Sequence, residues 1–208
     1  MSTDIYGCIE TRHPCADDDW YDDEQWLYAM DLSPLYSGND YTAFGCLFGV
    51  RNHAGWDPVA AGRGLPEDAS AEVRADYERW AALDALHSAT WVTWQELETL
   101  DMSAVPRGSS GLLRVQEPET SAAAWEYWVT DTWPPEIITR FGEPPVGSSP
   151  ATARPGTWTS GSAQLGFHRV TRGQALGPGS GWEHVFAVMK ALAGRFGPQG
   201  VRLVAYFD

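Results

Sequence analysis

The chain has 208 residues, of which 43% are hydrophobic and 12% aromatic, and its formal net charge is −14. This composition excludes a disordered chain and suits a globular protein with one substantial core. The negative charge repels nucleic-acid phosphates and anionic membrane surfaces, so general electrostatics exclude both as partners. No apolar run reaches the roughly 18 residues that a transmembrane helix needs.

The N-terminus, MSTDIYGCIE, lacks the basic and apolar regions of a signal peptide. Cys8, Cys15 and Cys46 form an odd set without a CxxC pair, which argues against a disulfide framework or a zinc site. We therefore expect a cytoplasmic protein with free thiols. The residue patterns predict no metal site and no cofactor.

The first half of the chain predicts two strands and three helices. Alternation over residues 4–10 predicts a strand with Ile5 and Ile9 on the same face. A helix is predicted over 41–51, capped by Asn39 or Asp40, with Arg51 in its last turn. The next helix follows a Ser70 N-cap. Residues 87–93 then predict an extended segment, and a Thr93–Glu96 capping box begins a short helix.

The second half predicts strands at 111–117 and 124–130, then a helical turn at 136–141. The Gly-, Pro- and Ser-rich residues 142–163 predict a mobile loop, and a strand follows that runs through Val170. Ser180 and Glu183 form a capping box before a continuous apolar stripe that ends at Phe196. Residues 201–207 have little polar interruption and predict an interior strand.

These elements predict an α+β fold. We expect a single domain over residues 1–208, with a mixed sheet that contains the N- and C-terminal strands. The amphipathic C-terminal helix should pack against this sheet. The sequence indicates no particular oligomeric state.

Residues 13–40 form an acidic, aromatic segment. Residues 1–40 hold ten acidic side chains and one basic residue, Arg12, and so carry −9 of the total charge of −14. A charged surface with aromatic anchors suits a basic protein partner, as in immunity or anti-defence proteins that block or sequester their target. A solvated acidic loop is the structural alternative. The predicted partner-binding residues are Asp17, Asp18, Asp19, Trp20, Asp22, Asp23 and Trp26.

A second hypothesis places a ligand site around the stretch RNHAGWDPVAAGRGLP, residues 51–66. Arg51 and Arg63 would grip a phosphate or carboxylate, while Asp4 or His87 would transfer protons in an enzyme or ligand-binding protein. Arg63 in a structural turn, paired with a carboxylate or a carbonyl, is the alternative. Ser88 is not expected to pair with His87, because neighbours on a strand point to opposite faces.

No GxGxxG, GxxxxGK[ST], HExxH or GxSxG signature is present. Five blocks of the sequence are DIYGCIE, YTAFGCLFGVRN, RGLPEDASAEV, HSATWVTWQEL and WEHVFAVMKALAGRFGPQGVRLVAYFD. Together they resemble a family of uncharacterised proteins found in actinobacteria and bacteriophages, and the resemblance implies no activity or site residues.

Overall fold

The larger sheet, sheet A, joins the two ends of the chain. A computed structural model describes residues 3–82, 86–117 and 125–208. Sheet A has the strand order β2-β1-β8-β3, and every neighbouring pair is antiparallel. Its strands are β1 (Ile5–Arg12), β2 (Trp26–Asp31), β3 (His87–Thr93) and β8 (Val201–Phe207). The predicted interior position of the terminal strand is confirmed, since β8 lies between β1 and β3.

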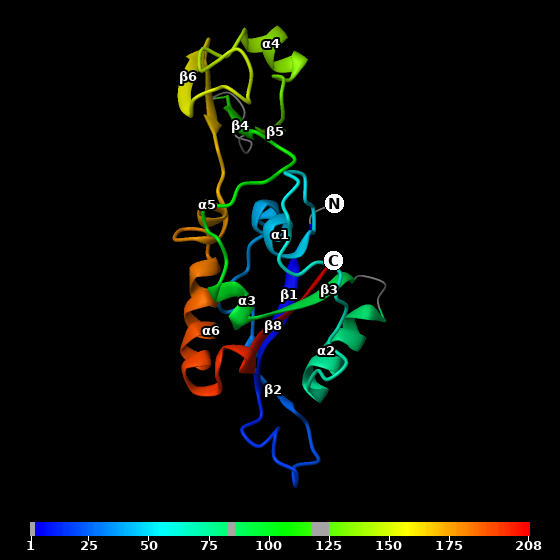
Figure 1. Ribbon diagram of the computed structural model, residues 1–208. Coiled ribbons are helices and arrows are strands. Elements are labelled where there is room, and N and C mark those ends of the chain that lie inside the picture. The colour runs from blue at the N-terminus through cyan, green and yellow to red at the C-terminus, as the bar shows by residue number, and fades with distance from the viewer. Residues whose placement is uncertain (1–2, 83–85, 118–124) are drawn as a thin grey trace.

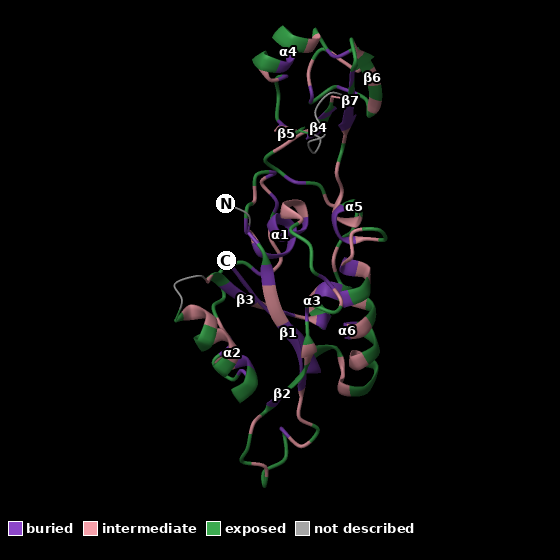
Figure 2. Ribbon diagram, turned by 180° about the vertical axis from the view of Figure 1, so that it is seen from behind, coloured by how far each residue is buried: buried purple, intermediate pink, exposed green. Residues whose placement is uncertain are grey.

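The two faces of sheet A are covered by different helices (Figure 1). On one face, Ile5 and Ile9 of β1 join the main core, which also contains residues of α6 (Trp182–Phe196). On the other face, Cys8 and Val204 pack with Val73 of α2 (Ala71–Ala81). The hydroxyl of Tyr206 in β8 donates a hydrogen bond to Asp76 of α2. Figure 2 shows that α2 and α6 expose their outer sides.

Short helices complete the main core. Asp40 caps α1 (Tyr41–Phe48) by accepting hydrogen bonds from the N–H groups of Thr42 and Ala43. The predicted Thr93–Glu96 capping box is confirmed at the start of α3 (Trp94–Glu98). The remaining short helices are α5 (Arg172–Leu176) and the 3-10 turn η1 (Pro198–Gly200).

Sheet B lies at one end of the molecule, beyond α1 and α5, and has its own small core (Figure 1). Its order is β5-β4-β7-β6, with α4 (Pro135–Phe141) packed on it. Trp128 of β5 and Val170 pack against the main core, so both sheets belong to one domain. The strands of sheet B are β4 (Gly111–Gln116), β5 (Trp125–Val129), β6 (Gly156–Ser160) and β7 (Ala163–His168).

The α+β class is confirmed, but the prediction of a mixed sheet is wrong. All pairings in both sheets are antiparallel, and the apolar run of β8 reflects an interior strand whose two faces are both covered. The prediction of one loop over 142–163 is also wrong in part, since residues 156–160 form β6. Ser160 pairs with Ala163, so Gly161 and Ser162 form a two-residue hairpin turn, with Gly161 at a φ of 61°.

Two predicted helix ends also differ from the structure. Helix α1 ends at Phe48, with Gly49 at a φ of 73° as its C-cap, so Arg51 lies outside the helix. At α6 the N-cap is Gly181 rather than Ser180. Glu183 nevertheless accepts hydrogen bonds from the N–H groups of Gly179 and Gly181, which ties the preceding turn to the helix.

Candidate functional site

Asp4 and His87, two of the predicted ligand-binding residues, meet at Asp208. The Asp4 N–H donates to Asp208 Oδ1 at 2.7 Å, and His87 Nε2 lies 2.9 Å from the backbone oxygen of Asp208. The hydroxyl of Tyr6 donates to Asp208 Oδ2 at 3.2 Å. Burial, with the nearby Asp208 carboxylate, raises the pKa of Tyr6. These contacts hold together the ends of β1, β3 and β8.

The expectation that His87 and Ser88 point apart is wrong. Ser88 has a φ of 53°, and the pairing of β3 with β8 is irregular between His87 and Thr90. This irregularity breaks the alternation of a regular strand. Ser88 Oγ therefore lies 2.8 Å from His87 Nδ1.

Arg51 lies close to the same end of sheet A. Its Nε donates to Thr3 Oγ1 at 3.0 Å, one residue before Asp4, and its backbone has a φ of 51°. The left-handed turn that follows Gly49 directs this arginine toward the start of β1. Three of the four predicted ligand residues thus lie at one end of the sheet.

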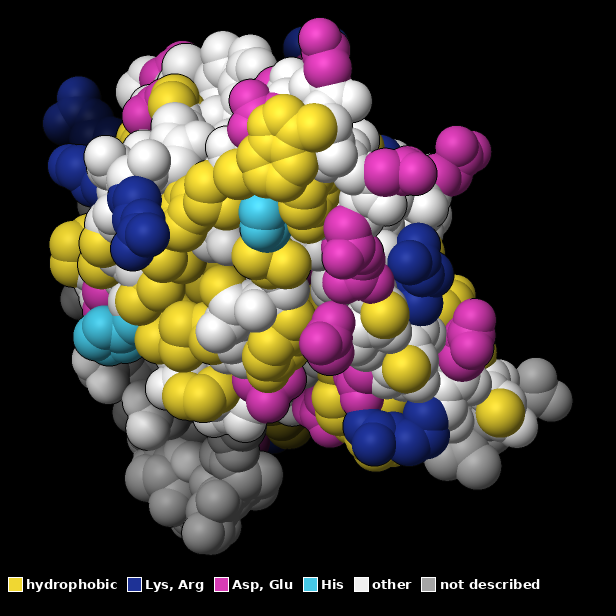
Figure 3. All heavy atoms as spheres, turned by 90° about the horizontal axis from the view of Figure 1, so that it is seen from below, with side chains coloured by type: hydrophobic (Ala, Val, Ile, Leu, Met, Phe, Trp, Pro, Cys, Tyr) yellow, Lys and Arg dark blue, Asp and Glu magenta, His cyan; other side chains and the backbone are white. Residues whose placement is uncertain are grey.

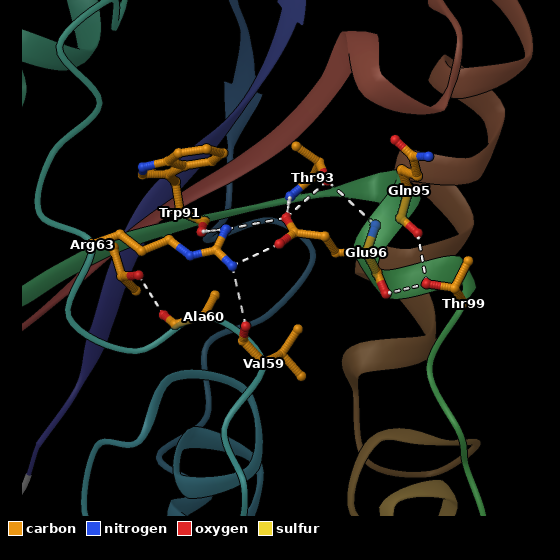
Figure 4. Close-up of polar contacts among 9 residues, drawn as sticks. Val59, Ala60, Arg63, Trp91, Thr93, Gln95, Glu96 and Thr99 are labelled. Carbon is orange, nitrogen blue, oxygen red and sulfur yellow. Dashed lines mark hydrogen bonds and ion pairs between the residues drawn. The ribbon is translucent and has the colours of Figure 1, made fainter.

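Arg63 contacts a different set of residues, which come from β3, α3 and its own loop (Figure 4). Its guanidinium donates to the carboxylate of Glu96 at 2.6 and 3.1 Å, and to the carbonyl oxygens of Trp91 and Val59. His87 pairs with Phe207 and Trp91 with Val204, three residues apart on β8, which corresponds to about 10 Å along the strand. Within the described residues, the hydrogen-bond partners of Arg63 therefore do not include Asp4, Arg51 or His87, and it takes the alternative role of pairing with a carboxylate and carbonyls.

A buried charge cluster lies at the opposite end of sheet A. Arg202 of β8 donates to Glu10 Oε2 of β1 and to Asp68 Oδ1, both at 2.7 Å. Glu10 also accepts a hydrogen bond from the N–H of Ser70, the N-cap of α2. The cluster therefore fixes the loop between Arg63 and α2 on the sheet. Sequence reasoning missed it, although an arginine inside the apolar run VRLVAYF was a signal.

Cations and indole rings alternate across this end of the sheet. The Arg202 guanidinium carbon lies 3.8 Å from the centroid of the Trp26 ring and 5.9 Å from that of Trp91. The Arg12 guanidinium carbon lies 6.0 Å from the Trp26 centroid, and that of Arg63 lies 5.0 Å from the Trp91 centroid. Trp26 is only 6% exposed and its Nε1 donates to Asp68, so the prediction that it forms partner contacts at the surface is wrong.

A pocket of about 800 Å³ opens beside these alternating arginine and tryptophan side chains, and we call it the Trp26/Trp91 pocket. Burial opposes ionisation of Asp68, but hydrogen bonds from Arg202 and Trp26 lower its pKa overall. Burial likewise opposes ionisation of Glu96, and Arg63 and Thr93 lower its pKa. Both carboxylates are therefore charged at neutral pH. The pocket is lined by Trp26, Arg63, Leu65, Pro66, Glu67, Asp68, Trp91, Thr93, Gln95, Glu96, Gln199 and Arg202.

The loop that joins β1 to β2, residues 13–25, is named here the acidic loop. All five of its predicted aspartates are exposed, and Trp20 is 72% exposed. Successive turns order the backbone: the N–H groups of Ala16, Asp18 and Tyr21 donate to carbonyls three residues earlier. Figure 3, which views the molecule from below, shows acidic side chains flanking an apolar surface.

The acidic loop adjoins the Trp26/Trp91 pocket. A second pocket, of about 550 Å³, includes Arg12 and Asp17 in its lining and shares Gln95 and Gln199 with the Trp26/Trp91 pocket. Arg12 pairs with Asp17 at 2.7 Å, and Arg74 lies 3.9 Å from Glu24, so both arginines face carboxylates of the loop. The loop and the two pockets thus lie next to one another on the same surface.

The part of the chain that the structure describes contains no cluster of three or more His, Cys, Asp or Glu side chains that could hold a metal ion. Within the same residues, no helix is both long and apolar enough to cross a membrane. Cys8, Cys15 and Cys46 are free thiols, as predicted.

Comparison of the chain with protein-family models, curated proteins and solved structures finds no match. The resemblance to actinobacterial and phage proteins therefore stays a prediction.

Proposed function

We propose that this protein binds a basic protein partner through the acidic loop, in the manner of proteins that block or sequester their target. The observation that supports this most directly is the exposure of Asp17, Asp18, Asp19, Asp22 and Asp23 on a loop whose backbone is already ordered. Exposed carboxylates steer a cationic partner, and an ordered loop loses little conformational entropy on binding.

Trp20 supplies the apolar contact for such an interface. At 72% exposure it is the most exposed large hydrophobic side chain among the described residues. It packs edge-on against Tyr21, which stacks on His13 with ring centroids 4.2 Å apart. Tryptophan is enriched at the energetic centres of protein interfaces. A tryptophan held by neighbouring rings and surrounded by aspartates suits a partner that is both basic and apolar.

The hypothesis of a site for small anions has less support. It required two arginines with free donors, but Arg63 is paired with Glu96 and lies apart from Asp4 and His87. Arg202, the other cation near Arg63, is paired with Glu10 and Asp68. An incoming phosphate would compete with carboxylates that are already in place.

The experiment is capture of partners from a native lysate, followed by zero-length carbodiimide cross-linking and mass spectrometry. The expected partner is basic, and its lysines should cross-link to aspartates of the acidic loop. The matched control is the Glu72→Gln, Glu78→Gln, Glu98→Gln, Glu136→Gln and Glu143→Gln variant, which removes five exposed carboxylates elsewhere. Changing Asp17, Asp18, Asp19, Asp22 and Asp23 to Asn should abolish capture, whereas the control should retain it. Equal capture by both variants refutes the proposal.

A further inference from the structure

We propose that the Trp26/Trp91 pocket takes a guanidinium group, namely an arginine side chain of the basic partner. This inference rests on the proposed function, because the pocket lies next to the acidic loop that would dock the partner. It adds the chemical group that the partner must present.

The charges of the pocket favour a cation over an anion. Its two arginines, Arg63 and Arg202, donate to Glu96, Glu10 and Asp68 and to backbone carbonyls, so their donors are engaged. Glu67 adds another carboxylate. The three carboxylates and two guanidinium groups that line the pocket give it a net charge of −1. A bound anion would meet this net negative lining, whereas a cation would reduce the charge.

Glu67 is the acceptor that remains available. Among the carboxylates that line the pocket it is the one without an ion pair or side-chain hydrogen bond within the described residues, and it is exposed at the rim. Gln95 and Gln199 contribute amide groups to the lining. A guanidinium has five N–H donors in a planar fork, which suits a carboxylate flanked by amide groups.

The indole rings favour guanidinium over ammonium. Arg202 and Arg63 already lie over the indole rings at this end of the sheet, so an incoming guanidinium would contact the exposed part of Trp91, which lines the pocket. Arginine stacks on aromatic faces and is less strongly hydrated than lysine, so it enters a partly apolar pocket at lower cost. Leu65 and Pro66 supply the apolar wall against which the methylenes of an arginine stem can pack.

The test uses the full chain and Nα-acetyl-arginine amide as the probe, followed through the indole N–H signals of Trp26 and Trp91 in NMR spectra. A Trp91→Phe variant assigns the Trp91 signal. For a ligand of this size we expect saturable shifts with a Kd of about 1 mM. The uncharged citrulline amide should give no saturable shift, and the lysine amide should bind at least about threefold more weakly.

Glu67→Gln should weaken binding of the arginine probe about fivefold, as expected for a charged contact at a partly exposed site. The matched control, Glu72→Gln, removes an exposed carboxylate that does not line the pocket and should leave the affinity unchanged. The inference is overturned if citrulline or lysine amide binds as tightly as arginine amide. It is also overturned if Glu67→Gln has no effect, or if the two indole signals do not move.

The outcomes separate this inference from the proposed function. If neutralising the acidic loop abolishes partner binding while the arginine probe does not bind, the pocket assignment fails and the proposed function stands. If the probe binds and Glu67→Gln weakens it, but loop neutralisation leaves partner binding unchanged, the pocket assignment stands and the proposed function fails.

Discussion

Arg202 on β8 lies directly opposite Glu10 on β1, and its Nε donates to Glu10 Oε2 at 2.7 Å although the two side chains are only 3% and 0% exposed. Burying two charges is costly, and the cost is offset only when their remaining donors and acceptors are satisfied. Here Asp68 and the N–H of Ser70 complete the network. The pair therefore fixes the loop that forms one wall of the Trp26/Trp91 pocket.

Removing Arg202 should be strongly destabilising. Arg202→Met leaves Glu10 as an unpaired buried charge, so we expect the free energy of unfolding to fall by about 3–5 kcal/mol. Urea unfolding followed by circular dichroism measures this change. A loss below about 1 kcal/mol, the range of exposed ion pairs, would contradict the structural role given to the pair.

Arg63 provides the contrasting case. Its side chain and that of Glu96 are 27% and 35% exposed, so solvent screens the pair. Arg63→Met should therefore cost only about 0.5–1 kcal/mol in the same urea experiment. A cost as large as that of Arg202→Met would show that the RGLP turn depends on Arg63 more than its exposure implies.

Acid should destabilise the protein through Asp68 and Glu96. Their pKa values are lowered in the folded state from ordinary values of 3.8 and 4.5. A lowered folded-state pKa stabilises the protein above the unfolded-state pKa, and this stabilisation is lost as the pH falls through the folded-state value. The Tm should therefore hold between pH 7 and about 5 and fall below about pH 4.5. A variant that carries both Asp68→Asn and Glu96→Gln should show a shallower fall of Tm with decreasing pH. An unchanged slope of Tm against pH would contradict the assignment of the acid sensitivity to these two carboxylates.

Two glycines should respond very differently to alanine. A Cβ on Gly7 would lie 2.0 Å from the backbone oxygen of Val204 in the adjacent strand, whereas a Cβ on Gly64 meets nothing within 4 Å. Gly7→Ala should therefore abolish soluble folded protein. Gly64→Ala, at a φ of 75°, should cost only about 1 kcal/mol. A folded Gly7→Ala variant of normal Tm would contradict the close pairing of β1 with β8.

Local patterns predicted the elements well because their causes are local. The Thr93–Glu96 box, the Ser70 cap and the alternation in β1 each depend on residues close in sequence. The missed strand β6 also had a local signal: the alternating residues of GTWTS precede a Gly–Ser turn. The Gly-, Pro- and Ser-rich composition of the surrounding segment obscured it.

The candidate surface was only partly predictable. The five loop aspartates were identified correctly as exposed because clustered charge is rarely buried. The prediction that Trp26 contacts a partner at the surface was wrong, because the burial of this side chain depends on Arg202 and Asp68, which are far away in sequence. Arg63 pairs with a carboxylate, as the structural alternative for this residue predicted, but the partner could not be named because Glu96 lies 33 residues further along the chain.

The most direct test of partner recognition by the acidic loop is the affinity of the captured partner for three purified proteins, measured by isothermal titration calorimetry at physiological ionic strength. These are the unmodified chain, the five-residue aspartate-to-asparagine loop variant and the five-residue glutamate-to-glutamine control. We predict that the loop variant weakens the Kd by at least about 100-fold, as expected for the loss of several complementary charges at an interface, while the control changes it less than about threefold. Equal effects of the two variants would show that only net charge matters and would contradict recognition by the loop.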